Sequence, residues 1–149
     1  MREILFRGKR LDNGEWVEGY YAKANHIISE KEVHVIFHTD LTLFPHSEFS
    51  SYEEVDPTTV GQYTGLKDKN GQRIFEGDIL KENYRVEGKH VLHEVAFGES
   101  SFGTKRFVSG KLSDVCIPFD DCENSMCAER ETEVIGNIHD NPKLFEEAK

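Results

Sequence analysis

Short runs of β-branched and aromatic residues, broken repeatedly by turn residues, dominate this sequence. Two Asn-Gly pairs, Asn13-Gly14 and Asn70-Gly71, each lie between two such runs. Asparagine and glycine both tolerate positive φ, which the tightest turns between antiparallel strands require. The pattern therefore predicts two β-hairpins, one over residues 4–21 and one over residues 60–75.

Other segments continue the β pattern. In residues 33–38, the apolar residues Val33, Val35 and Phe37 occupy alternate positions, which predicts a strand buried on one face. The segment 41–54 has no such pattern and is predicted to be a connecting loop. Further strands are predicted at residues 79–86, 91–97, 102–108, 112–117 and 133–138.

Only the end of the chain indicates a helix, over residues 140–147. Asn141 is the expected N-cap, and Pro142 is the expected first helical residue, where its missing N–H breaks no hydrogen bond. We expect the apolar pair Leu144 and Phe145 to dock on the sheet.

The pair Asp56-Pro57 marks the best internal boundary, because proline restricts the residue before it to an extended or turn conformation. We predict a hairpin-rich unit with a connecting loop over residues 1–59 and a second unit over residues 60–149, together forming one compact body. Short strands at this spacing are typical of a small barrel or sandwich. The predicted fold class is mainly β, with a small barrel-like second unit and a short C-terminal helix.

The formal net charge is −10, from 28 acidic and 18 basic residues. Affinity for duplex nucleic acid comes largely from lysine and arginine displacing counterions. The charge balance therefore excludes a general phosphate-backbone binder, although it allows a local basic patch. Hydrophobic residues make up 37% of the chain, which predicts a thin core. The sequence has neither the apolar centre of a signal peptide nor a membrane span, so we expect a cytoplasmic protein without a membrane partner.

The cysteines and histidines lack the spacing of a metal site. Cys116, Cys122 and Cys127 follow a Cys-x5-Cys-x4-Cys pattern, whereas structural zinc sites bring their ligands in tight pairs. We expect Cys116 to be buried in a strand. His34 and His38 fall on one predicted strand about 13 Å apart, too far to share an ion, and are predicted to face solvent. No metal or other cofactor is predicted.

Common catalytic motifs are also missing. The turn that starts at Asp68 begins like a calcium loop, but it lacks the glycine and glutamate that an EF-hand requires at its sixth and twelfth positions. Carboxylates cluster at residues 53–56, 120–123 and 129–133, yet no nucleophile accompanies them, so they are interpreted as solvated faces. The sequence contains no phosphate-binding glycine loop and no Gly-x-Ser-x-Gly elbow. We predict no catalytic or cofactor-binding residue.

The first hairpin is the one candidate interaction site, because basic and aromatic residues alternate along it. Such a mixture suits single-stranded nucleic acid, since aromatic rings stack on bases and cations neutralise phosphates. The alternative is that the rings pack inward or against another subunit, and the net negative charge favours this second interpretation. The candidate residues are Arg7, Lys9, Arg10, Trp16, Tyr20 and Tyr21.

Four sequence motifs lie at residues 6–19, 60–71, 74–80 and 135–142. Together they resemble the YopX family of phage and prophage proteins. The resemblance implies a β-rich protein of a bacterial host's cytoplasm that assembles with copies of itself, and it supplies no catalytic residue. The segment from Ile74, with its Gly77-Asp78 pair, also resembles the opening strand of SH3-like barrels, so the second unit is predicted to be an SH3-like half-barrel or barrel.

These observations predict an acidic, all-β phage or prophage protein without a catalytic site. It would act through self-assembly and through contact with an unknown phage or host protein. Two alternatives stay open. One is an accessory nucleic-acid binder that uses the first hairpin, and the other is an enzyme of unrecognised type.

Overall fold

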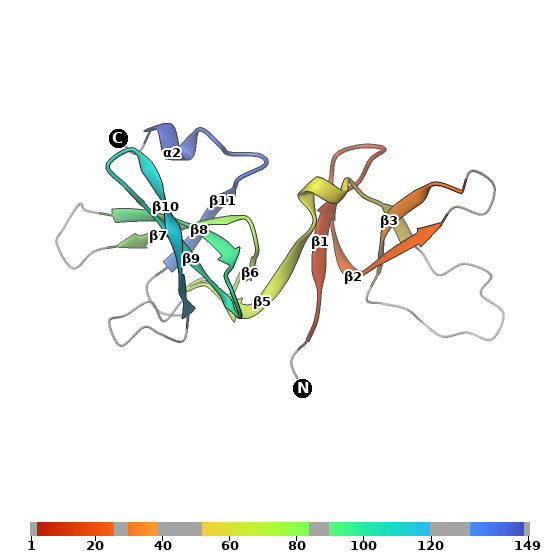
Figure 1. Ribbon diagram of the computed structural model, residues 1–149, viewed down its shortest axis with the longest axis horizontal. Coiled ribbons are helices and arrows are strands. Elements are labelled where there is room, and N and C mark those ends of the chain that lie inside the picture. Colours follow the sequence, from red (N-terminus) through yellow and green to blue (C-terminus); the bar gives the residue numbers. More distant parts are fainter. Residues whose placement is uncertain (1–2, 26–29, 39–51, 84–89, 120–131, 148–149) are drawn as a thin grey trace. The chain divides into compact units, whose positions relative to one another are not determined.

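The computed structural model describes residues 3–25, 30–38, 52–83, 90–119 and 132–147 (Figure 1). The chain divides into two compact units, Met1–Tyr63 and Thr64–Lys149. This division lies four residues after the boundary expected between residues 59 and 60, inside a strand. Two antiparallel sheets account for most of the described chain.

The described residues of the first unit form four strands and one turn of 3-10 helix. The strands are antiparallel and follow the order β4-β3-β2-β1 in the sheet. The predicted first hairpin is confirmed, with Lys9 opposite Trp16 at its closed end. The strand β4 lies inside a segment predicted to be a loop, and it pairs with β3. The elements are β1 (Phe6–Lys9), β2 (Trp16–Asn25), β3 (Glu32–Phe37), β4 (Tyr52–Glu54) and η1 (Pro57–Thr59).

The first hairpin turns through a loop of four residues, Leu11 to Gly14. The N–H of Arg10 donates to the Glu15 carbonyl at 2.9 Å, and the N–H of Gly14 donates to the Arg10 carbonyl at 3.0 Å. Only Gly14 of the Asn-Gly pair has a positive φ, of 73°. Asn13 instead uses its side-chain oxygen to accept the N–H of Glu15. The predicted hairpin therefore forms through a four-residue loop in which only the glycine of the pair has a positive φ.

The core of the first unit is small. Val17, Ile36 and Val55 form a buried cluster, and Tyr21 packs against it. In β3, the consecutive residues Val35 and Ile36 are 4% and 0% exposed. The two side chains point to opposite faces of a strand, so β3 is covered on both faces at its centre. The prediction of a strand buried on one face is wrong there.

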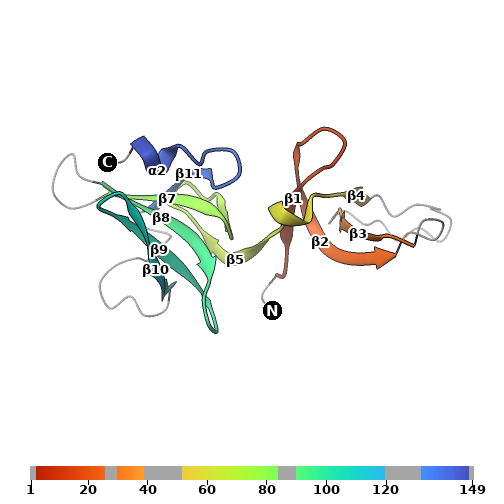
Figure 2. The same ribbon diagram turned by 45° about the horizontal axis from the view of Figure 1, so that its top comes forward.

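The second unit is built on a five-stranded antiparallel sheet with the order β10-β9-β8-β7-β11 (Figure 2). The strand β5 crosses the boundary between the units, and the six-stranded sheet continues through it to β6, in the order β4-β3-β2-β1-β5-β6. All the predicted strands of this unit are present. They are β5 (Gly61–Lys67), β6 (Arg73–Phe75), β7 (Asp78–Asn83), β8 (His90–Phe97), β9 (Phe102–Val108), β10 (Lys111–Pro118) and β11 (Thr132–Asn137).

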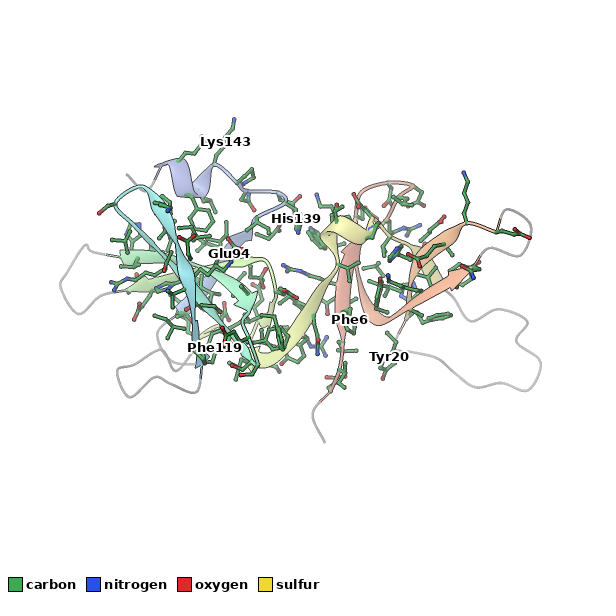
Figure 3. All side chains as sticks on the ribbon, in the orientation of Figure 1. Phe6, Tyr20, Glu94, Phe119, His139 and Lys143 are labelled. Carbon is green, nitrogen blue, oxygen red and sulfur yellow. The ribbon has the colours of Figure 1, made fainter. Side chains whose placement is uncertain are left out.

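Both faces of the five-stranded sheet are partly covered. On one face, Ile74 of β6 forms a buried cluster with Leu80 of β7 and Val95 of β8, and Phe119 packs against it (Figure 3). On the other face, Phe145 of α2 (Leu144–Glu147) lies 5.2 Å from the ring of Phe107, which confirms the predicted docking. The strands β10 and β11 are the sheet's two edges. The described strands therefore form an open sheet and not a closed barrel.

The predicted N-cap residue has a different role. The side-chain oxygen of Asn141 accepts the N–H of Asn137 at 3.3 Å, which ties it back to the end of β11. The helix begins at Leu144, whose N–H donates to the Asn141 carbonyl at 3.1 Å. The expected start of the helix at residues 140–142 is wrong, because the turn after β11 uses these residues.

Candidate functional site

Three of the six candidate residues meet on one face of the first hairpin. In the pairing of β1 with β2, Arg7 lies opposite Glu18 and Lys9 lies opposite Trp16. The Arg7 Cζ is 4.7 Å from the centroid of the Trp16 ring, and the Lys9 Nζ is 5.5 Å from it. Both distances are within the range of cation–π attraction. The two cations thus lie over the indole ring, and a carboxylate lies directly across from one of them.

The two tyrosines point to opposite faces of β2. Tyr21 contacts the core of the first unit, where its ring is 5.4 Å from that of Phe6 and its hydroxyl hydrogen-bonds to His34 Nδ1. Tyr20, labelled in Figure 3, is 46% exposed and lies opposite Phe37. Adjacent residues of a strand face opposite ways. The pair therefore cannot act together as a single stacking surface.

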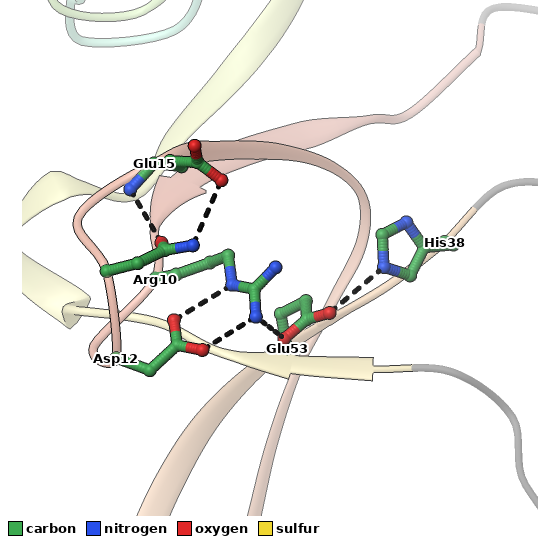
Figure 4. A network of polar contacts seen from close by, with 6 residues as sticks. Arg10, Asp12, Glu15, His38 and Glu53 are labelled. Carbon is green, nitrogen blue, oxygen red and sulfur yellow. Dashed lines mark hydrogen bonds and ion pairs between the residues drawn. The ribbon is translucent and has the colours of Figure 1, made fainter.

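Arg10 belongs to a network of ion pairs beside the turn (Figure 4). Its Nε and Nη2 donate to the two carboxylate oxygens of Asp12 at 2.9 and 2.7 Å, and Nη2 also lies 3.1 Å from Glu53. The other Glu53 oxygen is 3.6 Å from the His38 Nε2. The hydrogen bond with Asp12 raises the pKa of Arg10, and the same bond lowers the pKa of Asp12. Arg10 is thus held by two carboxylates.

The six candidate residues of the first hairpin therefore do not form a single site. Arg7, Lys9 and Trp16 lie together, while Tyr21 faces the core and Arg10 binds carboxylates at the turn. These cations already have electrostatic partners within the chain. Binding of nucleic acid at this hairpin stays a prediction.

The structure also shows where the residues considered as possible metal ligands lie. His34 and His38 lie on and just after β3 and contact Glu32 and Glu53, respectively. The side chain of His34 is 15% exposed, so its predicted solvent-facing position is wrong. Cys116 lies in β10 as predicted, where partial burial raises the pKa of its thiol. Over the described ranges, the structure contains no cluster of three metal-ligating side chains. Cys122, Cys127 and the carboxylates at 120–123 and 129–131 fall outside the described residues.

A buried polar pair in the second unit was missed by the sequence analysis. His93 of β8 is only 4% exposed in its side chain, and its Nε2 lies 3.0 Å from Glu82 of β7. Burial lowers the pKa of His93, against the opposing effect of Glu82, and the charge of Arg106 on β9 lowers it further. The Nδ1 atom has no hydrogen-bond partner within the described residues. The available signal was that His93 occupies an inward position between Val91 and Val95.

Acid is expected to destabilise the fold through His93. Its pKa is lower in the folded chain than its ordinary value near 6.5, so the neutral imidazole is the form that the fold favours. Stability is full above pH 6.5 and falls as the pH drops from there to the folded-state pKa, with a slope of up to about 1.4 kcal/mol per pH unit. Urea unfolding at pH 7.5, 6.5 and 5.5 measures this slope. The variant His93→Gln should show a smaller loss over the same range, and an equal loss in both proteins would contradict the assignment.

Exposed apolar side chains lie on three neighbouring strands of the second sheet, β8, β9 and β10. Phe97 opposes Phe102, Val108 opposes Lys111, and Ile117 opposes Thr104. Because Phe102, Thr104 and Val108 alternate along β9, their partners lie on one face. Val115 lies on the same strand as Ile117, in the stretch between Leu112 and Cys116 where the register against β9 shifts. We name this surface the β8–β10 apolar face, and its exposed members are Phe97 (52%), Val108 (52%), Val115 (66%) and Ile117 (47%).

The sequence analysis did not predict this surface. It identified Val115 and Ile117 only as members of a strand. Their exposure depends on two features of the fold that the sequence pattern does not predict. The strand β10 is an edge of the sheet, and the buried members of the cluster around Ile74 come from β6, β7 and β8.

Residues in the motifs that carry the family resemblance stabilise turns and strand ends. The Asp68 carboxylate accepts three backbone N–H groups, those of Asn70, Gln72 and Val134. A second buried carboxylate, that of Asp78, accepts the N–H of Phe75 at 2.8 Å. The side-chain oxygen of Asn137 accepts the N–H groups of His139 and Asp140. Each of these polar side chains therefore holds the backbone in place.

The described residues contain no helix long and apolar enough to cross a membrane. Comparisons of the whole chain with known proteins agree with the β architecture. The crystal structure of protein EF1440 from Enterococcus faecalis is similar to this chain, with a TM-score of 0.57 and 27% sequence identity over 97% of this chain and 99% of that one. No curated protein matches. The model of the family described as YopX protein matches residues 5–146. The chain therefore belongs to the YopX protein family.

Proposed function

We propose that this protein works by binding copies of itself, and through them a phage or host protein, and that it catalyses no reaction. The observation that carries the proposal is the β8–β10 apolar face, where four large apolar side chains are about half exposed or more. Single exposed apolar residues are normal, whereas several on neighbouring strands of one sheet favour an interaction site. The phage setting rests on the earlier resemblance to phage and prophage proteins.

Assembly through this face is physically favourable. Each apolar side chain that leaves water on association contributes roughly 25 cal/mol per Å² of buried apolar area. The thin core of the second unit leaves these side chains on its surface, with the buried cluster of Ile74, Leu80 and Val95 on neighbouring strands.

The proposal that the protein is not an enzyme has its own support. A catalytic carboxylate needs a position from which it can reach a substrate. Two buried aspartates of the family-like motifs, Asp68 and Asp78, already accept backbone N–H groups. We further propose that the open five-stranded sheet with β6 is the half-barrel form of the SH3-like unit. The turn at Gly77, with φ of 81°, that leads into β7 supports this reading.

Light scattering on the purified protein tests the assembly. The wild-type chain is expected to have a mass at micromolar concentration that is a multiple of 17.1 kDa. Changing Ile117→Asp places a charge on the apolar face and should reduce that mass to 17.1 kDa. The matched control is Leu11→Asp, which adds the same charge at an exposed apolar residue of the first unit. Loss of assembly in both variants, or in neither, would contradict the proposed surface.

A further inference from the structure

We propose that the Asn70-Gly71 pair, in the turn between β5 and β6, is a covalent modification site at which Asn70 deamidates spontaneously. The chain contains two Asn-Gly pairs, Asn13-Gly14 and Asn70-Gly71. Asparagine reacts most readily before glycine, because no Cβ of the next residue blocks the approach of its backbone nitrogen to the side-chain carbonyl. The sequence does not separate the two pairs, whereas their hydrogen bonds do.

The reaction converts the side-chain amide into a carboxylate and adds a negative charge. The Gly71 nitrogen gives its proton to hydroxide and forms a bond to the Asn70 Cγ. The Cγ–Nδ2 bond then breaks, and the amino group takes a proton from water and leaves as ammonia. Water opens the resulting succinimide ring, to aspartate when the new bond breaks and to isoaspartate when the original peptide bond breaks. One water is consumed for each ammonia released, and no oxidant or reductant takes part.

The side-chain amide is fixed in one pair and not in the other. The Asn13 Nδ2 donates to the Glu15 Oε2 and the Asn13 Oδ1 accepts the Glu15 N–H, both at 2.9 Å. The Asn70 side chain is exposed, and none of the described residues hydrogen-bonds to its amide. Because the amide of Asn13 must leave both partners before it can react, we expect it to deamidate about tenfold more slowly than Asn70.

The attacking nitrogen has a similar environment in both turns. The N–H of Gly14 donates to the Arg10 carbonyl at 3.0 Å, and that of Gly71 donates to the Asp68 carbonyl at 2.9 Å. A Cβ at either glycine would meet no atom within 4 Å, so both turns have open space around them. The difference between the pairs therefore lies in the side-chain amide.

Isoaspartate at position 70 would disturb the turn that Asp68 holds. Its main chain runs through Cβ and Cγ, which inserts a further atom before Gly71. The Asp68 Oδ1 accepts the Gln72 N–H at 2.9 Å, and the Asp68 N–H donates to the Gln72 carbonyl at 2.9 Å. Both bonds span the inserted atom. Deamidation to isoaspartate is therefore expected to displace Gln72 and loosen the turn.

Peptide mapping by mass spectrometry tests the site. The full chain is incubated at mildly alkaline pH, folded and in concentrated urea, until the urea sample has deamidated. In urea, Asn13 and Asn70 should convert at similar rates, because no hydrogen bond fixes either amide. In the folded chain, Asn70 is expected to convert about tenfold faster than Asn13. No conversion of Asn70 in the folded chain, or a rate no faster than that of Asn13, would overturn the proposal.

Two variants test the cause of the difference. Glu15→Ala removes the acceptor of the Asn13 Nδ2 and should raise the rate at Asn13 while leaving Asn70 unchanged. Gly71→Ala places a Cβ beside the attacking nitrogen and should slow Asn70 alone. An unchanged rate at Asn13 in Glu15→Ala would contradict the role of the hydrogen bonds.

Hydrogen exchange on the separated products tests the effect on the turn. The isoaspartate form should exchange the amide of Gln72 faster than the unmodified chain does. The control is Asn70→Asp, which adds the same charge without the additional backbone atom and should keep the slower exchange. Equal exchange in all three proteins would contradict the displacement of Gln72.

Discussion

The variant Gly19→Ala is expected to lose about 3 kcal/mol or more of the unfolding free energy of the first unit. A Cβ atom at this position of β2 would lie 1.9 Å from the carbonyl oxygen of Phe37 and 2.8 Å from its carbonyl carbon. Both atoms belong to the backbone of β3, so no side-chain rotation can relieve the overlap. The pairing of β2 with β3 would have to open, and this pairing holds Ile36 in the core.

The one tryptophan of the chain makes this effect measurable. Trp16 lies in β2 of the first unit, so its fluorescence during urea unfolding reports on that unit. The control is Gly14→Ala in the same hairpin, where φ is 73° and a Cβ would meet no atom within 4 Å. That variant has only backbone strain and should lose about 1 kcal/mol. If Gly19→Ala unfolds at the same urea concentration as Gly14→Ala, the predicted overlap is wrong.

The variant Asp68→Asn is expected to destabilise the second unit by about 2–4 kcal/mol. The buried Asp68 carboxylate accepts N–H groups at 2.8 Å from Asn70, 2.9 Å from Gln72 and 3.0 Å from Val134. Asparagine keeps one acceptor oxygen and replaces the other with an amino group. That amino group would face an N–H donor, and at least one buried donor would lose its partner.

Calorimetry on the second unit's transition, together with hydrogen exchange, measures this loss. The amide of Val134 is expected to exchange faster in Asp68→Asn, because its acceptor is the Asp68 Oδ2. Glu146→Gln makes the same chemical change at an exposed carboxylate of α2 and should leave both measurements unchanged. Wild-type stability and exchange in Asp68→Asn would show that the three hydrogen bonds do not hold β11 to the turn.

The sequence was sufficient to locate most strands, because local alternation and turn residues determine them. The hairpins around Gly14 and Gly71 and the strands from β7 to β11 were all found in this way. The strand β4 was not, since its three residues, Tyr52–Glu54, have little pattern of their own and form a strand through pairing with β3. The double burial of β3 also depends on tertiary packing, which alternation within one strand cannot predict.

The candidate site was less predictable than the fold. Residues 7–21 are close together in the sequence. Because successive side chains of β1 and β2 point to opposite faces, Tyr21 packs in the core whereas Arg7 lies against Trp16. The residues of the β8–β10 apolar face, in contrast, are far apart in the sequence. Phe97 and Ile117 are twenty residues apart in the sequence and come to one face only through the register of three strands. The sequence does not state which strands become neighbours in the sheet, so it could not predict this grouping.

Sedimentation equilibrium of the unmodified chain tests the central claim most directly. We expect the mass to rise with concentration from 17.1 kDa toward the dimer and to fall again on dilution, as a reversible contact through the β8–β10 apolar face requires. A mass of 17.1 kDa at every concentration up to the solubility limit would contradict self-assembly.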